Sequence, residues 1–365
     1  MPIWKRLGFL LVFVVPALMP MAAWLGVRSG HPALMAWFPL FFLFVVLPVV
    51  DVLLGHDPGQ PRADAEAALE HDAWFRAITL VALPVQVALL AWSAWYLLHA
   101  GLGVVGAVGW MLSQGVVGGV IAINVAHELI HKDTRLEPMV GGLLLASVGY
   151  HGFKVEHVRG HHVHVSTPRD ASSARAGQTL WNFLPRALLL NNINAWRLEA
   201  RRLRGRGLHW CHWRNELIGW TAVWLGAAGA FWLWLGPIGF VFFVAQGLLA
   251  ACALETINYI EHYGLERARL ADGRYERTTH MHSWNSDYAL SNLILLHLQR
   301  HSDHHESPRR RYPLLQHHAA SPQLPGGYAA MLVLALFPPL WFRVVDPVLA
   351  YWKDASAGRP QLLTH

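Results

Sequence analysis

Cysteine is nearly absent from this sequence, which has only Cys211 and Cys252 in 365 residues. Two thiols that lie far apart cannot build a disulfide scaffold, and they cannot supply the four thiolates of an iron–sulfur site. Any four-cysteine iron site that works with this chain must therefore belong to another protein.

Charge is also scarce, at 14% of residues against about a quarter in ordinary soluble domains. Hydrophobic residues make up 54% of the chain, which includes 18 tryptophans. A soluble globule of this size needs more surface charge, so the composition argues against a cytosolic enzyme, a disordered chain and a fibrous one. No internal repeat is visible, and we treat residues 1–365 as a single membrane domain.

Long apolar stretches are what the sequence has instead. A helix needs about 20 apolar residues to cross the hydrocarbon core, and six stretches reach that length. Turn residues join them in pairs, which predicts three helical hairpins and an all-α integral membrane protein. A seventh run, 328–342, is interrupted by Pro338-Pro339 and is interpreted as interfacial or packed. The predicted spans are residues 7–27, 33–54, 76–98, 104–126, 216–235 and 238–258.

The distribution of Lys and Arg predicts the orientation. The hairpin tips carry one such residue, Arg28, whereas the loop 132–214 carries thirteen. The positive-inside rule then places the N-terminus, this loop and the C-terminal third on the cytosolic side. We expect six transmembrane helices in the inner (plasma) membrane, with a cytosolic histidine-rich cap from 127–214 and 259–325.

Histidine is unusually abundant, with 23 residues, and nine of them fall into four tight groups. Three pairs are spaced i, i+4, so both members of each pair are expected to share a helix face and point at one metal. One ion takes four to six ligands, so nine imidazoles fit two metals and leave at least one coordination position free. Imidazole binds Zn, Fe, Cu and Ni, so the ligand type alone does not identify the metal. The predicted ligands are His127, His131, His157, His161, His162, His262, His301, His304 and His305.

Carboxylates and amides lie next to these histidines. Metal-bound imidazoles usually donate their second N–H to such a group, although the same side chains can also cap helices. Asn124 lies one helical turn before His127. Four other histidines are close enough to the groups to support the site: His164, His280, His282 and His297. His317, His318 and His365 are expected to be exposed. The predicted supporting residues are Glu128, Glu156, Glu255, Asn258, Glu261 and Asp303.

Taken in order, these motifs resemble those of the membrane-bound alkane monooxygenases, which are integral-membrane non-haem di-iron hydroxylases. The resemblance covers roughly residues 70–320, and six spans with cytosolic histidine boxes are typical of that family. Three places depart from the family pattern: His151-Gly152 stands in reversed order, Arg169 replaces an acid, and Glu306-Ser307 is not the commonest version. The matching motifs are His127-Glu128-Leu129-Ile130-His131-Lys132, Glu156-His157-Val158-Arg159-Gly160-His161-His162, Asn258-Tyr259-Ile260-Glu261-His262-Tyr263-Gly264-Leu265 and Leu298-Gln299-Arg300-His301-Ser302-Asp303-His304-His305.

The resemblance implies an alkane 1-monooxygenase that hydroxylates terminal methyl groups to primary alcohols. It implies two non-haem Fe ions as cofactors, O2 as cosubstrate, and no haem, flavin or Fe–S cluster in this chain. The implied partners are a separate rubredoxin with its NADH-dependent reductase, membrane lipid and an apolar small-molecule substrate, without nucleic acid. The basic stretch Arg201–Arg206 is interpreted either as a dock for an acidic carrier or as a site for anionic lipid headgroups.

Other functions fit parts of the pattern. A xylene- or cymene-type methyl hydroxylase and a fatty acyl desaturase or hydroxylase share the histidine boxes. His127-Glu128-Leu129-Ile130-His131 also matches the zinc protease pattern H-E-x-x-H, but an intramembrane protease leaves seven grouped histidines unexplained. A metal transporter would place its site near the bilayer midplane, where these spans carry almost no ionisable residue.

Overall fold

The computed structural model describes residues 1–61, 64 and 66–357, and His365 lies outside this range. Within these residues the chain is helical and contains no strand, as the composition predicts. The N-terminal part contains α1 (Ile3–Gly8), η1 (Phe9–Phe13), α2 (Val14–Ser29), α3 (Pro32–Met35), α4 (Phe38–Phe41), η2 (Phe42–Val46), α5 (Leu47–Leu54), α6 (Glu66–Glu70), α7 (Ala73–His99), α8 (Gly103–Gly118), η4 (Gly119–Asn124) and α9 (Val125–Leu129).

The remaining elements follow the first histidine group. They include the longest helix of the described chain, α14, and several short helices around the site. They are α10 (Leu136–Ser147), α11 (Phe153–Glu156), η5 (His157–His161), α12 (His162–His164), α13 (Leu180–Arg204), α14 (Glu216–His262), α15 (Ala289–Ile294), α16 (His301–Glu306), η6 (Tyr312–Leu314), α17 (Tyr328–Ala335) and α18 (Pro338–Ala357).

Four helices of the described chain are long and apolar enough to cross a membrane: Ile3–Ser29, Glu66–His99, Gly103–Leu129 and Glu216–His262. The first three of these helices contain the first, third and fourth predicted spans, and Glu216–His262 contains both the fifth and the sixth. The second predicted span corresponds to the shorter apolar helix Phe38–Leu54. That helix starts later than expected because Pro39 lies in its first turn, where the missing proline N–H breaks no helical bond. The six-span count therefore stays a prediction.

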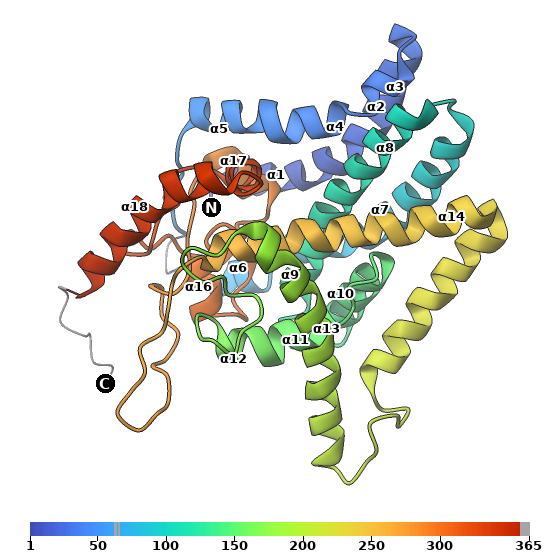
Figure 1. Cartoon of the computed structure of the whole chain (residues 1–365). Helices are drawn as coiled ribbons and strands as arrows, with labels where there is room; N and C mark the ends of the chain where they lie inside the picture. Colours follow the sequence, from blue (N-terminus) through green and yellow to red (C-terminus); the bar gives the residue numbers. More distant parts are fainter. Residues whose placement is uncertain (62–63, 65, 358–365) are drawn as a thin grey trace.

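The 47-residue helix α14 is two helical segments joined by a sharp bend. Gly236 has φ 67° and ψ −159°, a conformation that glycine adopts without a steric penalty, and Pro237 follows it. Figure 1 shows that α14 turns back on itself. The bend coincides with the hairpin turn that the sequence predicts between residues 235 and 238.

The second segment of α14 packs against α8 in the middle of the bundle. A Cβ added at Gly115 would clash with the Cβ of Leu249, so the two backbones approach more closely than any larger residue allows. Small residues at such contacts are typical of helices that pack in membranes. The helical stretch Gly103–Leu129 continues from α8 through η4 into α9, so this packing brings His127 in α9 and His262 at the end of α14 to the same side of the bundle.

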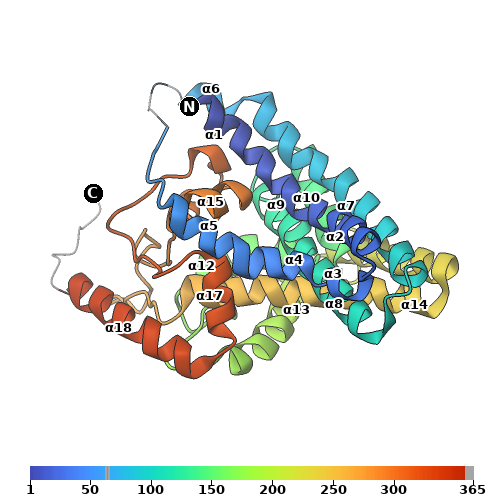
Figure 2. The same cartoon turned by 90° about the horizontal axis from the view of Figure 1, so that it is seen from above.

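Figures 1 and 2 show where the shorter elements lie relative to the long helices. The helix α10 belongs to the segment expected as cytosolic cap, yet it is apolar, and most of its side chains are buried against α7, α9 and α14.

The run that starts at residue 328 forms two helices, α17 and α18, and the second begins at Pro338. This division agrees with the expected interruption.

Candidate metal centre

The nine predicted ligands come together in two groups, which are the groups of this kind found among the described residues. Within each group the potential ligand atoms lie within 4.8 Å of one another. The first group contains five histidines and the second contains four. The first is His127, His131, His157, His162 and His304, and the second is His161, His262, His301 and His305.

The second histidine motif is divided between the two groups, which differs from the expected i, i+4 pairing. His157 belongs to the first group with His162, whereas His161 belongs to the second. The reason is that residues His157–His161 form a π-helical turn, in which the His162 N–H donates to the carbonyl of His157. A π turn bonds residues i and i+5 and therefore aligns His157 with His162 rather than with His161.

The ring nitrogens converge at distances that suit coordination. Nε2 of His157 lies 3.0 Å from Nε2 of His162, and Nε2 of His305 lies 2.9 Å from Nε2 of His301. Ligands about 2.1 Å from one metal, at angles of roughly 90–109°, are about 3.0–3.4 Å apart. The buried Nε2 atoms of His127 and His131 have no hydrogen-bond partner within the described chain. These donor atoms fit two metal positions.

Five of the predicted ligands that lie outside the candidate spans are electrically neutral near neutral pH. Burial lowers the pKa of His157, His162, His301, His304 and His305 well below the usual value, and neighbouring imidazoles lower it further. A metal ligand must be the neutral imidazole with a free lone pair. The folded chain thus presents these five imidazoles in the form that binds a cation.

Two of the predicted supporting carboxylates, with the amide of Asn258, connect neighbouring helices. Glu261 Oε2 lies 3.2 Å from Nε2 of His301, while Oε1 accepts a hydrogen bond from the Tyr328 hydroxyl at 2.8 Å. Glu255 accepts from Asn258, from Asn191 and from the Tyr150 hydroxyl. These contacts connect the C-terminal end of α14 to α13 and α17 and hold the helix that carries His262.

Glu128 and Asp303, two of the other predicted supporting carboxylates, have partners other than the ligand histidines. Glu128 forms an ion pair with Lys132 at 2.9 Å and accepts the Tyr312 backbone N–H at 3.3 Å. Asp303 accepts from Arg310 and His318. Burial, with Asp170 and Glu255 nearby, raises the pKa of Glu156 well above its usual value.

Two residues near the site were missed or misjudged from the sequence. Asp170 lies in the turn after the second motif, and its Oδ2 is 2.9 Å from Nδ1 of His161. Burial would raise the pKa of Asp170, but His161 and the hydrogen bond from Ser173 together outweigh burial and lower this pKa. His318, expected to be exposed, is half-buried and bonds Asp303, which raises the His318 pKa. The sequence feature that could have identified Asp170 is its position, since it is a carboxylate nine residues after the predicted ligand His161.

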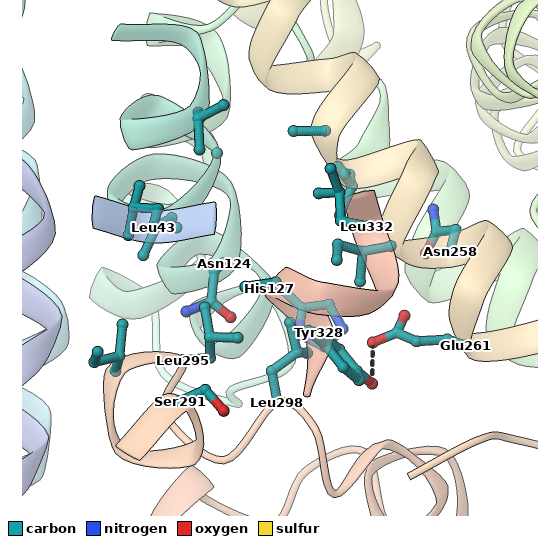
Figure 3. A pocket seen from close by; sticks show the side chains of 18 of the residues that line it. Leu43, Asn124, His127, Asn258, Glu261, Ser291, Leu295, Leu298, Tyr328 and Leu332 are labelled. Carbon is teal, nitrogen blue, oxygen red and sulfur yellow. Dashed lines mark hydrogen bonds between the residues drawn. The ribbon is translucent and has the colours of Figure 1, made fainter. Parts of the chain in front are cut away.

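An apolar cavity borders both histidine groups (Figure 3). Its empty volume is about 930 Å³, which includes open space at its mouth. The walls come from Phe38–Leu54, from η4, from the second segment of α14, and from α15 and α17. One ligand of each group, His127 and His301, is part of the lining.

Two tryptophans, Trp92 and Trp110, pack against each other within the bundle. Trp110 is fully buried and donates to the carbonyl of Ser93, and Trp92 packs edge-on against it. Neither of them nor Trp95 lines this cavity.

A helical membrane fold with a histidine-rich centre beside an apolar cavity is the arrangement of an integral-membrane metalloenzyme that acts on hydrophobic substrates. The fatty acid desaturase family model matches residues 102–335. The chain is 51% identical over 363 residues to alkane 1-monooxygenase 2 of Pseudomonas aeruginosa, which covers 99% of this chain and 95% of that protein. It is 50% identical to alkane 1-monooxygenase 2 of Alcanivorax borkumensis, over 96% of this chain and 92% of the relative.

A more distant relative is the xylene/toluene monooxygenase hydroxylase component of Pseudomonas putida, at 29% identity over 70% of this chain and 68% of that protein. The identity to the two alkane 1-monooxygenases is much higher, which places the chain with them rather than with the xylene/toluene enzyme. The chain belongs to the alkane 1-monooxygenase family and is a monooxygenase.

Proposed function

We propose that this enzyme hydroxylates the terminal methyl group of alkanes to primary alcohols at a di-iron centre held by the nine histidines. The observation that carries the proposal is the apolar cavity whose wall contains His127 from one group and His301 from the other. A methyl group at that end of the cavity lies beside both metal positions.

The reaction consumes one alkane, one O2, two electrons and two protons, and it yields one alcohol and one water. Two bound iron ions supply O2 activation. Five imidazoles would hold one ion and four the other, which leaves room for O2 because iron commonly accepts up to six ligands. Imidazole donors alone fit several metals, and the family resemblance favours iron.

The chain's own residues position the reactants. The Asp170 carboxylate fixes His161 with Nε2 toward the second group, because Nδ1 faces the carboxylate. Tyr328 fixes Glu261 beside His301. The apolar walls exclude water and hold the hydrocarbon chain by its surface, which orients one end at the metals. Two of the candidate spans, Gly103–Leu129 and Glu216–His262, contribute to the cavity walls, which suits a substrate dissolved in the bilayer.

The electrons come from a separate rubredoxin and its NADH-dependent reductase in this proposal, since the chain lacks the cysteines for such a site. We place the enzyme in the inner membrane with six spans, its histidines toward the cytosol. Arg201–Arg206, at the end of α13, stays a candidate for contact with the carrier or with anionic headgroups; Arg202 in this stretch is paired with Glu199.

A reconstituted assay tests the function. The full chain is loaded with iron in lipid discs and supplied with octane, O2, NADH, rubredoxin and reductase; octan-1-ol should accumulate, and omission of rubredoxin should abolish it. Xylene serves as the competing substrate because a xylene/toluene enzyme is among the relatives. Faster hydroxylation of xylene than of octane would contradict the alkane assignment, and full activity without a carrier would contradict the electron route.

A further inference from the structure

Asn124 carries the least satisfied polar side chain of the cavity wall. It is 7% exposed, it lines the cavity, and neither Oδ1 nor Nδ2 has a hydrogen-bond partner within the described residues. Apart from the two ligand histidines, the other polar groups of the lining are paired: Tyr328 donates to Glu261, Asn258 donates to Glu255, and the Ser291 hydroxyl accepts from Gln299. Figure 3 shows the Asn124 amide among apolar side chains of the cavity.

The backbone places this amide next to the metal end of the cavity. Asn124 is the last residue of the π-helical turn η4, one helical turn before His127, which lines the same cavity. Such turns are rare and occur often at functional sites. Gln114 on α8 also has an unpartnered amide, but it does not line the cavity. Asn124 therefore differs from a polar residue that is merely buried in the bundle.

A buried amide without a partner destabilises the protein by about as much as a hydrogen bond stabilises it. A molecule that enters the cavity can supply the partner that the chain does not give to Asn124. An amide both donates and accepts, which matches a hydroxyl group and no part of a hydrocarbon. Within the proposed reaction, the first hydroxyl to appear at this place is that of the alcohol.

We propose that Asn124 binds the hydroxyl group of primary alcohols at the metal end of the cavity, so that it distinguishes the product from the alkane. The inference rests on the proposed function for the identity of the alcohol. It assigns to this cavity a second ligand class, aliphatic primary alcohols, with the hydroxyl toward His127 and the chain along the apolar walls. Asn124 acts as a specificity residue in this role and takes no part in the bond-breaking step.

The test compares octan-1-ol with nonane, which has the same number of non-hydrogen atoms but no hydroxyl. Inhibition constants against octane turnover and ligand-induced shifts in melting temperature are measured for the iron-loaded full chain, wild type and Asn124→Leu. The variant should bind octan-1-ol about tenfold more weakly and nonane within about threefold of wild type. Val120→Ala is the matched control, because it changes an apolar residue of the same turn and should affect both ligands equally.

Structural roles predict different results. If Asn124 only supports the fold, Asn124→Leu melts well below wild type without ligand; we expect it to melt no lower, because an unsatisfied amide is removed. Loss of iron from the variant would assign Asn124 to the metal and overturn the proposal, as would an equal loss for both ligands or unchanged octan-1-ol binding. Asn124→Ala repeats the comparison if the leucine variant does not fold.

The melting shifts need no turnover, so they separate this inference from the proposed function. Octan-1-ol binding that depends on Asn124 in a chain that does not hydroxylate octane would support the hydroxyl site and refute the alkane reaction. If the chain hydroxylates octane but octan-1-ol binding does not depend on Asn124, the result would support the alkane reaction and refute the hydroxyl site.

Discussion

The carboxylate of Asp170 lies 2.9 Å from Nδ1 of His161, and the Ser173 hydroxyl donates to the same carboxylate oxygen at 2.6 Å. This contact leaves His161 with Nε2 directed at the second histidine group, where it lies 3.3 Å from Nε2 of His305. The turn that ends at Asp170 thus controls the orientation of a ligand nine residues earlier in the chain.

Removing this carboxylate should weaken the second metal position. Residues that orient a ligand histidine typically change metal affinity by about 10–100-fold when they are mutated. We expect Asp170→Ala to lower the affinity for one of two irons by that factor, while Asp170→Asn, which keeps one acceptor, loses less. Iron titration into the iron-free protein measures both. Asp272→Asn removes an exposed carboxylate as control; equal affinities for Asp170→Ala and wild type would refute the orienting role.

Histidine substitutions should separate ligands from other buried histidines. His131 belongs to the first group, whereas His297 is also buried, lies outside both groups and faces the Tyr312 carbonyl at 3.0 Å. We expect His131→Ala to lose iron and hydroxylation, and His297→Gln to keep about two irons per chain while its melting temperature falls. Metal analysis of purified protein checks this. Iron loss in His297→Gln alone would contradict the ligand assignment.

Removing the metals should also destabilise the fold. The nine histidines come from α9 and the turn after it, η5, α12, α14 and α16, so two ions would connect segments that are far apart in sequence. An ion that binds only the native state stabilises it by mass action, by about 2.7 kcal/mol at 100 times its dissociation constant. A chelator should therefore lower the melting temperature, and re-addition of iron should restore it. An unchanged melting temperature would argue that the histidine groups bind no ion tightly.

A buried carboxylate on α13 should make the stability of the fold depend on pH. Glu199 accepts from Arg159 at 2.8 Å, from Arg202 and from the backbone N–H of Glu216. Burial would raise the pKa of Glu199, but these donors outweigh it, so the folded-state pKa lies below the ordinary 4.5. The carboxylate therefore contributes stability above pH 4.5, and this contribution is lost as pH falls through the folded-state pKa.

The variant Glu199→Gln should accordingly be less stable than wild type at pH 7, by about 1–3 kcal/mol. The difference should shrink as pH falls below about 4.5. Thermal unfolding of both proteins across this range measures the effect, and Glu266→Gln controls for the loss of an exposed carboxylate. A difference that does not change with pH would show that packing, rather than charge, explains the loss.

The sequence predicts which histidines gather but not how they divide. Spacing identifies the nine residues because their type and order are specific, and the ordinary i, i+4 rule of an α-helix places His127 with His131 correctly. The same rule fails for His157 and His161, since a π-helical turn depends on tertiary packing that local spacing does not encode. The burial of α10 and the contact of Asp170 with His161 also depend on long-range packing.

The last prediction concerns Glu128, because it separates two interpretations of His127-Glu128-Leu129-Ile130-His131. A zinc protease would use this carboxylate as general base, and its replacement by Gln would leave the metal bound and remove nearly all activity. In the structure the carboxylate instead pairs with Lys132 and accepts from Tyr312, while Lys132 donates to the carbonyls of Arg309 and Arg310. Glu128 thus holds the end of the first motif against the segment after the third.

Glu128→Gln keeps the shape and one acceptor but leaves the buried Lys132 without its counter-charge. We expect stability to fall by about 1–3 kcal/mol, and iron content and octane hydroxylation to fall partially and together. The double variant Glu128→Gln with Lys132→Met removes the unpaired charge and should recover part of the stability, which a double-mutant cycle measures. Full iron occupancy with complete loss of hydroxylation would instead support a general base at Glu128 and refute its role as a connection between the motifs.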